Sequence, residues 1–234
     1  MLKQSAFLLA LAGFAVALPA QASIVTLTGS TVDYTFDNSL LGLFGTPAVS
    51  GNTLYFTPTT FKAQSANGGG YTLTDSTVNI QVDAKPGYLF SKVGLHESGD
   101  YLLLGSGSQA DVTGQIRVFR LSQPLGVITR SIVPTAPLDL TGTPTHNWHA
   151  KAGANLAAWN TGAPINVTVE NLLLANTITT PSSLAFVQKK YIGLTVVTAP
   201  VPEAETWALM LAGLGLVGLQ LRRSKGAVRQ PGNA

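Results

Sequence analysis

The sequence predicts an all-β protein: a two-sheet antiparallel β-sandwich of jelly-roll type, with one apolar segment near each end of the chain. Three observations predict this class. Polar and apolar residues alternate with a period of two in several segments, as expected for half-buried strands. Glycine, proline, asparagine, aspartate and serine separate these segments at the spacing of hairpins. Between the two terminal apolar runs, no segment has a sustained helical spacing.

Residues 1–22 are predicted to be a secretory signal peptide. Lys3 precedes an apolar run over residues 6–18, and Ala20 and Ala22 occupy the small-residue positions of a cleavage site. Signal peptidase is therefore an expected partner, with cleavage after Ala22. The alternative is a buried N-terminal helix, which the uninterrupted apolar run disfavours. We expect the chain to leave the cytoplasm.

The predicted sandwich domain covers residues 23–200. Its clearest alternation lies in residues 76–84, 114–122 and 164–175. Further strands are expected over residues 24–28, 32–36, 53–57, 71–75, 88–93, 101–104, 146–150 and 191–197. Strands at hairpin spacing cannot form parallel units, so they must cover their apolar faces with a second antiparallel sheet. A closed barrel is the alternative arrangement.

Turns and one irregular region separate the expected strands. The expected turns are residues 50–52, 65–70, 84–87 and 97–100. Residues 123–145 hold four prolines and are interpreted as a long connection or an edge excursion within a single domain.

Charge and cysteine content exclude several classes of function. The formal net charge is +3, but acidic and basic residues are equal in number between residues 23 and 200, so the surplus lies in the terminal segments. Because the body has no basic stripe, nucleic acid is not an expected partner. The chain has no cysteine, which excludes thiol nucleophiles, thiol redox chemistry and cysteine-bound zinc.

No group of residues predicts an enzyme, a cofactor or a metal site. His146 and His149 are three residues apart, which on a strand places them on opposite faces, and no nearby carboxylate supplies a third zinc ligand. His96 is assigned, with its acidic neighbours, to a solvated hairpin end. The Gly-Ser-Gly of residues 105–107 lacks the spacing of a nucleophile elbow. A pair of carboxylates meeting in space for glycoside hydrolysis stays open as an enzymatic alternative.

Two weaker binding sites are weighed against structural roles. Four aspartates are candidate ligands for a calcium ion, although they lack the spacing of a calcium-binding loop. These are Asp33, Asp37, Asp75 and Asp83. Trp148 and Trp159 are candidate glycan contacts, since aromatic faces stack on sugars, although a core position is favoured for each.

The C-terminal segment, residues 201–234, joins an acidic turn, an apolar run over residues 207–221 and a basic end. As a helix, this run is about 22 Å long, shorter than a bilayer core of about 30 Å. Trp207 and the arginines that follow the run extend it by interfacial anchoring, and the positive-inside preference keeps the basic end cytoplasmic. A transmembrane helix that serves as a transient anchor is therefore expected. The alternatives are a permanent membrane anchor and a buried core helix.

This segment resembles the PEP-CTERM sorting signal of Gram-negative bacteria. The resemblance covers about the last 34 residues and rests on the order of a short acidic motif, an apolar run and an arginine-rich end. The matching positions are Val201, Pro202, Glu203, Glu205, Trp207, Arg222 and Arg223. Ala204 departs from the pattern, where the signal usually has proline.

The resemblance implies an exosortase as partner and a course of export. It implies an inner-membrane intermediate, cleavage near residues 201–203, and release to the cell surface or to an exopolysaccharide (biofilm) matrix. The expected function is that of a non-enzymatic secreted surface or matrix protein without a cofactor. The alternative is a carbohydrate-binding module that recognises matrix polysaccharide through Trp148 or Trp159.

Overall fold

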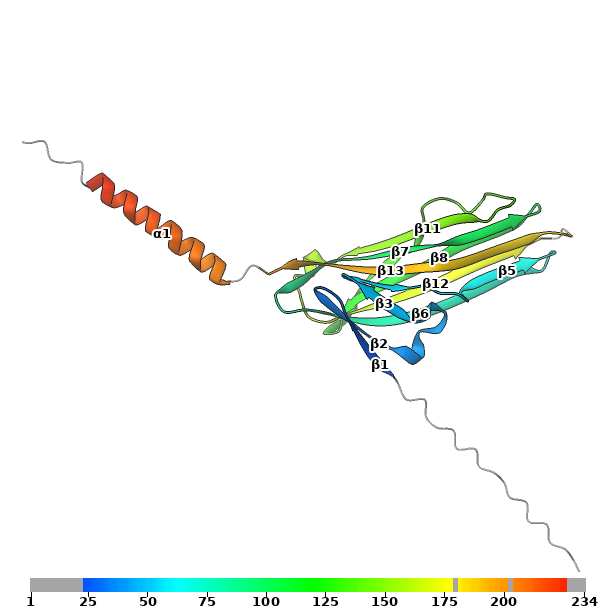
Figure 1. The fold of residues 1–234 in the computed structure, drawn as a ribbon, viewed down its shortest axis with the longest axis horizontal. Coiled ribbons are helices and arrows are strands. Elements are labelled where there is room, and N and C mark those ends of the chain that lie inside the picture. The colour runs from blue at the N-terminus through cyan, green and yellow to red at the C-terminus, as the bar shows by residue number, and fades with distance from the viewer. Residues whose placement is uncertain (1–22, 179–180, 202–203, 227–234) are drawn as a thin grey trace, which may run out of the picture.

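The computed structural model describes residues 23–178, 181–201 and 204–226 (Figure 1). The predicted signal peptide, with Ala20 and Ala22, lies outside these residues, and so do Pro202 and Glu203.

Two antiparallel sheets form the body of the molecule. The first sheet contains, in spatial order, β1 (Ile24–Thr28), β2 (Val32–Asp37), β6 (Gly70–Ala84), β12 (Ile165–Thr177), β8 (Ser108–Arg120) and β9 (Gln123–Ser131). The second contains β10 (Val133–Pro134), β11 (His146–Asn155), β7 (Tyr88–Leu104), β13 (Leu184–Pro200), β4 (Thr53–Phe56) and β3 (Pro47–Ser50), and β5 (Lys62–Ala66) pairs with β13. Short 3₁₀ turns lie at η1 (Asn38–Leu40), η2 (Gly42–Phe44) and η3 (Ala157–Trp159).

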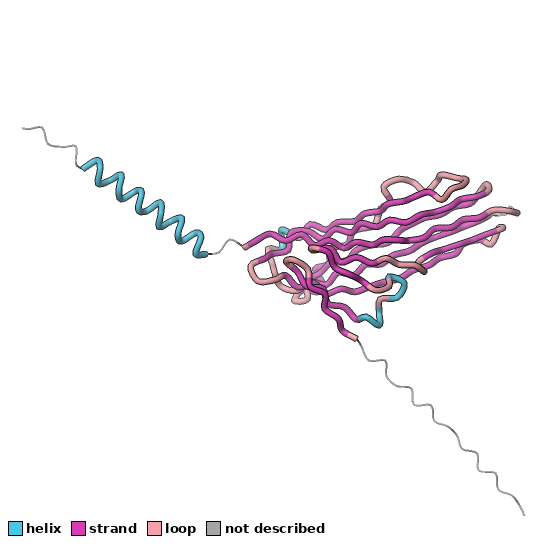
Figure 2. Tube along the Cα trace, viewed as in Figure 1, coloured by secondary structure: helices cyan, strands magenta, loops and turns pink. Residues whose placement is uncertain are grey.

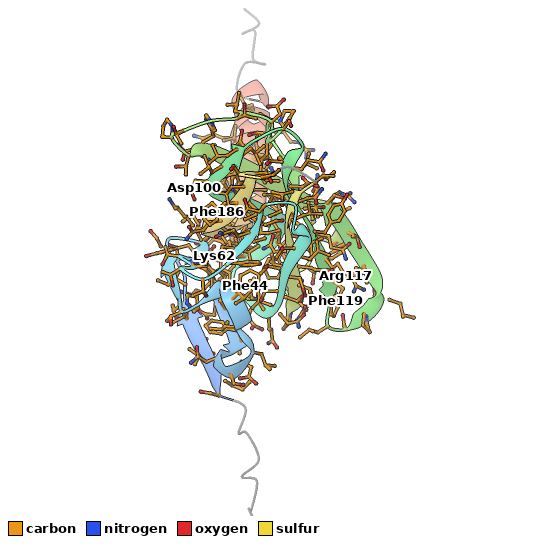
Figure 3. The ribbon with its side chains drawn as sticks, turned by 90° about the vertical axis from the view of Figure 1, so that its right-hand side faces the viewer. Phe44, Lys62, Asp100, Arg117, Phe119 and Phe186 are labelled. Atoms are coloured by element: carbon orange, nitrogen blue, oxygen red, sulfur yellow. The ribbon has the colours of Figure 1, made fainter. Side chains whose placement is uncertain are left out.

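The prediction of a two-sheet antiparallel sandwich is confirmed. In Figure 3, Arg117 and Phe119 of β8 lie on one side of the body, while Lys62 and Phe186 of the second sheet lie on the other. The apolar residues of the alternating segments face the core between the sheets. In β6 and β12 the alternating residues that reach the core are Val78, Ile80, Val82, Ile165, Val167 and Val169.

The expected turn at residues 97–100 is wrong, because β7 continues through it from Tyr88 to Leu104. The two acidic residues in this segment each have a lysine partner on β13, the neighbouring strand: Glu97 pairs with Lys189, and Asp100 with Lys190. The assignment of His96 to a hairpin end is wrong for the same reason. Acidic residues with such partners are compatible with a central strand.

The proline-rich region divides into two parts. Residues 123–134 form β9 and β10, each at the edge of a sheet, so the predicted edge excursion is confirmed for this part. Residues 135–145 contain no strand and connect β10 to β11. Strands β3 and β5 were not expected from the sequence, since neither shows a strong alternation of apolar and polar residues.

Helix α1 (Ala204–Gly226) follows the last strand and lies beyond one end of the sandwich (Figure 2). The described side chains of residues 208–222 are exposed. Within the described part of the chain, no helix reaches the combination of length and apolar character that a membrane span requires.

Candidate functional site

The structure separates the two candidate glycan-binding tryptophans. Trp148 is only 3 % exposed, and its Nε1 donates to the carbonyl of Gln188 at 3.2 Å. Its ring belongs to the core, which is the position the sequence favoured and which leaves no face for a sugar. Trp159 is partly buried against the core, and the Arg120 guanidinium lies 5.4 Å from the centre of its ring. Of the two, only Trp159 is accessible.

Histidines and tyrosines form a row across the outer face of the second sheet. His96 stacks on His149 with ring centres 5.6 Å apart, and Tyr55 stacks on Tyr191 at 6.2 Å. The ring of Tyr191 lies 6.3 Å from that of His96 and therefore joins the two pairs. A Cβ on Gly193 would lie 2.6 Å from the Tyr191 hydroxyl, so this glycine gives the ring its space. We call these four side chains the ring row; they come from β4, β13, β7 and β11.

A shallow hollow of about 380 Å³ adjoins the tyrosine end of the ring row. Ser50 and Thr53 line it together with Tyr55 and Tyr191. The rings and hydroxyls together make a surface with apolar faces and adjacent hydrogen-bonding groups, the combination that sugar rings require. The sequence did not indicate this surface, because the four rings come from four separate strands.

His146 and His149 point to opposite sides of β11, as predicted. His149 is exposed in the ring row, whereas His146 is partly buried with its ring 5.6 Å from that of Tyr101. Among the described residues, no three histidine, aspartate or glutamate side chains come together as a set of metal ligands.

The four candidate calcium ligands do not converge. Asp33 and Asp83 face each other across β2 and β6, with the Lys85 ammonium 3.9 Å from Asp33. Asp37 instead accepts hydrogen bonds from the hydroxyl and the backbone of Ser39, which lower the pKa of its carboxyl. Asp75 pairs with Leu172 on β12.

A polar cluster that the sequence did not indicate lies in the core between the sheets. Lys189, Glu97 and Asn171 are each 0 % exposed. The Lys189 ammonium donates to Asn171 Oδ1 at 2.6 Å and also contacts Glu97 Oε2. Burial lowers the pKa of the Lys189 amine, and the charge of Glu97 opposes part of that change. We call these three side chains the core triad.

The C-terminal segment leaves the sandwich directly from β13. The backbone N–H of Val201 donates to the carbonyl of Gly87 at 2.8 Å, so the chain is held to the turn between β6 and β7 up to this residue. Glu205, Trp207, Arg222 and Arg223 follow in the backbone of α1. The described chain therefore passes from Val201, held to the sandwich, to α1, whose described side chains are exposed.

Residues 200–224 match the family model of the PEP-CTERM protein-sorting motif. This chain carries a PEP-CTERM sorting motif. The PEP-CTERM motif implies export, processing by an exosortase and delivery to the cell surface, as the resemblance of the tail predicted. A comparison with curated proteins gives no match. The PEP-CTERM match begins at the last residue of β13, so apart from this residue it does not cover the sandwich.

Proposed function

We propose that this protein is a non-enzymatic structural component of the cell surface or exopolysaccharide matrix, exported by residues 1–22 and sorted through its C-terminal tail. The observation that carries the proposal is the sorting motif at residues 200–224, placed directly after the last strand of a sandwich with its own core. The body needs no cofactor for this role.

In this proposal the tail is a transient membrane anchor. Helix α1 has 23 residues, about 35 Å at about 1.5 Å per residue, but its described residues are not apolar enough over that length to qualify as a membrane span by themselves. Its apolar part is shorter, so Trp207 at one end and the Arg222–Arg223 pair at the other anchor it at the two interfaces. The arginines stay on the cytoplasmic side of the membrane. The segment that the exosortase cleaves then lies on the outer side of the membrane.

A first prediction concerns the proteolytic processing of the tail. In a host with an exosortase, the full-length precursor is expected to convert to a shorter exported form, faster with Ala204→Pro and slower with Glu203→Ala. The proline restores the usual motif, whereas the alanine removes its carboxylate. Pulse-chase labelling with immunoblotting measures the rates, and Glu170→Ala, an acidic position on β12, is the control that converts at the wild-type rate. If every variant stays membrane-bound at full length, the tail is a permanent anchor.

A second candidate function is carbohydrate binding, favoured by the ring row and its adjoining hollow. A long polysaccharide can lie along a flat sheet face and stack several sugar rings in series, while the hydroxyls of Ser50 and Thr53 bond its hydroxyls. Because Trp148 is buried, Tyr55 and Tyr191 replace it as the proposed glycan contacts.

Carbohydrate binding makes its own prediction. Tyr191→Ala is expected to weaken binding of the protein to exopolysaccharide from its host about fivefold, the equivalent of about 1 kcal/mol for one stacking contact. Tyr71→Ala, which removes an exposed ring on β6 of the first sheet, is the matched control and should bind as the wild type does. Affinity electrophoresis in gels containing the polysaccharide measures both. Equal mobility shifts for wild type and Tyr191→Ala would remove the ring row as the site.

A further inference from the structure

The core triad joins the two sheets through side chains that a sandwich core does not usually contain. Lys189 lies on β13 and Glu97 on the neighbouring β7, both in the second sheet, whereas Asn171 lies on β12 of the first sheet. A charged pair in the core is often no more stable than apolar side chains of the same volume. The triad therefore calls for a role other than packing.

Two atoms of the triad are left without a hydrogen-bond partner among the described residues. They are Glu97 Oε1 and Asn171 Nδ2, both buried. Unsatisfied polar atoms in a core are costly and uncommon, and a catalytic role is one explanation for them. Here one is the second oxygen of a carboxylate and the other is the amide nitrogen next to a lysine amine.

The surroundings place a nucleophile against an electrophile in a dry site. The Phe61 and Trp148 rings lie 5.6 Å and 5.4 Å from Lys189 Nζ, and both are buried, so water is excluded. The lowered pKa of Lys189 favours the neutral amine, which is the nucleophilic form. Its nitrogen contacts the Asn171 side-chain amide, whose carbon is bonded directly to the accepting oxygen.

We propose that Lys189 and Asn171 form a covalent crosslink, an amide bond between Lys189 Nζ and Asn171 Cγ, with Glu97 as the catalytic proton carrier. The amine lone pair attacks Cγ, and the Nζ–Cγ bond forms. Glu97 takes a proton from Nζ and delivers it to Nδ2, the Cγ–Nδ2 bond breaks, and ammonia leaves. One amine and one amide give one new amide and one ammonia, so the step needs no oxidant, reductant or co-reactant.

Local backbone geometry places both reacting side chains toward the core. A β-bulge between Lys189 and Tyr191 changes which residues of β13 face inward, so Lys189 faces the core and Tyr191 the outer surface. A glycine lies opposite each reacting residue: Gly99 faces Lys189 on β7, and Gly114 faces Asn171 on β8. A Cβ on Gly99 would lie 2.8 Å from the Trp148 ring, so this glycine lets the ring lie beside the amine.

The crosslink fits an exported domain that lacks cysteine. Exported proteins commonly use disulfides as covalent ties, and this chain has none to form. The amide bond would tie β13, the strand that leads into the sorting segment, to the middle of the opposite sheet. A pull on the C-terminal tail would then be borne by a covalent bond as well as by strand pairing.

The experiment is mass spectrometry of the purified, denatured full chain, whether or not its tail has been processed. We expect a mass lower than the sequence mass by one ammonia. Trypsin should cut after Lys151 and Lys190 but not after Lys189, and should yield residues 152–190 lighter by one ammonia. A further cut by chymotrypsin at Phe186 should leave the pieces that contain Asn171 and Lys189 joined.

Variants separate the crosslink from other losses of ammonia. Glu97→Gln and Lys189→Arg keep the size of the side chain and should retain the full mass, while Lys190→Arg, at the adjacent exposed lysine, should lose ammonia as the wild type does. A wild-type chain of full mass that trypsin cuts after Lys189 overturns the proposal. An ammonia loss from residues 152–189 that persists in Lys189→Arg also overturns it, because a succinimide at an asparagine of this peptide would then explain the mass. None of these outcomes depends on sorting.

Discussion

Replacing Lys189 with methionine is expected to lower the free energy of unfolding by about 3–5 kcal/mol, the cost of removing one partner of a buried ion pair. Methionine fills a similar volume, so a cavity contributes little. The loss arises because Glu97 and Asn171 lose the side chain that they both contact in the core, and because the bond to β12 can no longer form. Urea unfolding of the exported protein, followed by circular dichroism, measures the difference.

Two control variants test that cause. Lys151→Met removes an exposed lysine of β11 and should change the free energy of unfolding by no more than about 0.5 kcal/mol. Adding Glu97→Leu to Lys189→Met should recover part of the lost stability, because no charge is then left unpaired. A Lys189→Met protein as stable as the wild type would show that the core triad contributes nothing to the fold.

Gly99→Ala is expected to destabilise the sandwich by about 3 kcal/mol, at the upper end of the range for overpacked cores. A Cβ at this position would lie 1.9 Å from the carbonyl oxygen of Gln188 and 2.8 Å from the Trp148 ring. Neither group is free to move, since the carbonyl belongs to β13 and the indole is buried. The midpoint of urea unfolding measures the effect, and Trp148 fluorescence should change with it.

Gly126→Ala is the matched control for this substitution. Gly126 lies on the edge strand β9, where a new Cβ would make an ordinary contact at 3.6 Å. It should leave the unfolding midpoint close to that of the wild type. An equal loss of stability in both glycine variants would mean that the close contacts at Gly99 do not explain the result.

The fold was predictable where apolar and polar residues alternate along a strand. Ile165, Val167 and Val169 alternate with polar residues, and all three lie in the core. The continuity of β7 was not predictable, because Ser98, Gly99 and Asp100 have the composition of a turn. Only the partners on β13 and the ring of Trp148 explain why a strand passes through them.

The core triad was also not predictable from the sequence, because its members are far apart in the chain. Adjacent lysines usually indicate a solvated surface, and Lys189 meets a glutamate 92 positions away in the sequence. One signal was present: Asn171 continues the inward positions of Ile165, Val167 and Val169, where the pattern calls for an apolar residue. A polar residue at an inward position of an otherwise regular strand marks a place where the core holds a partner for it. The sorting motif, in contrast, is local in sequence and was predictable without the fold.

We expect this chain to be exported and to lose its sorting tail. The most direct test is to determine both termini of the protein recovered from the cell surface and medium of a host with an exosortase. We expect an N-terminus at Ser23 and a C-terminus between Val201 and Glu203, which leaves the sandwich intact and removes α1. A protein found in the cytoplasm with Leu2 and Ala234 still present would contradict the account.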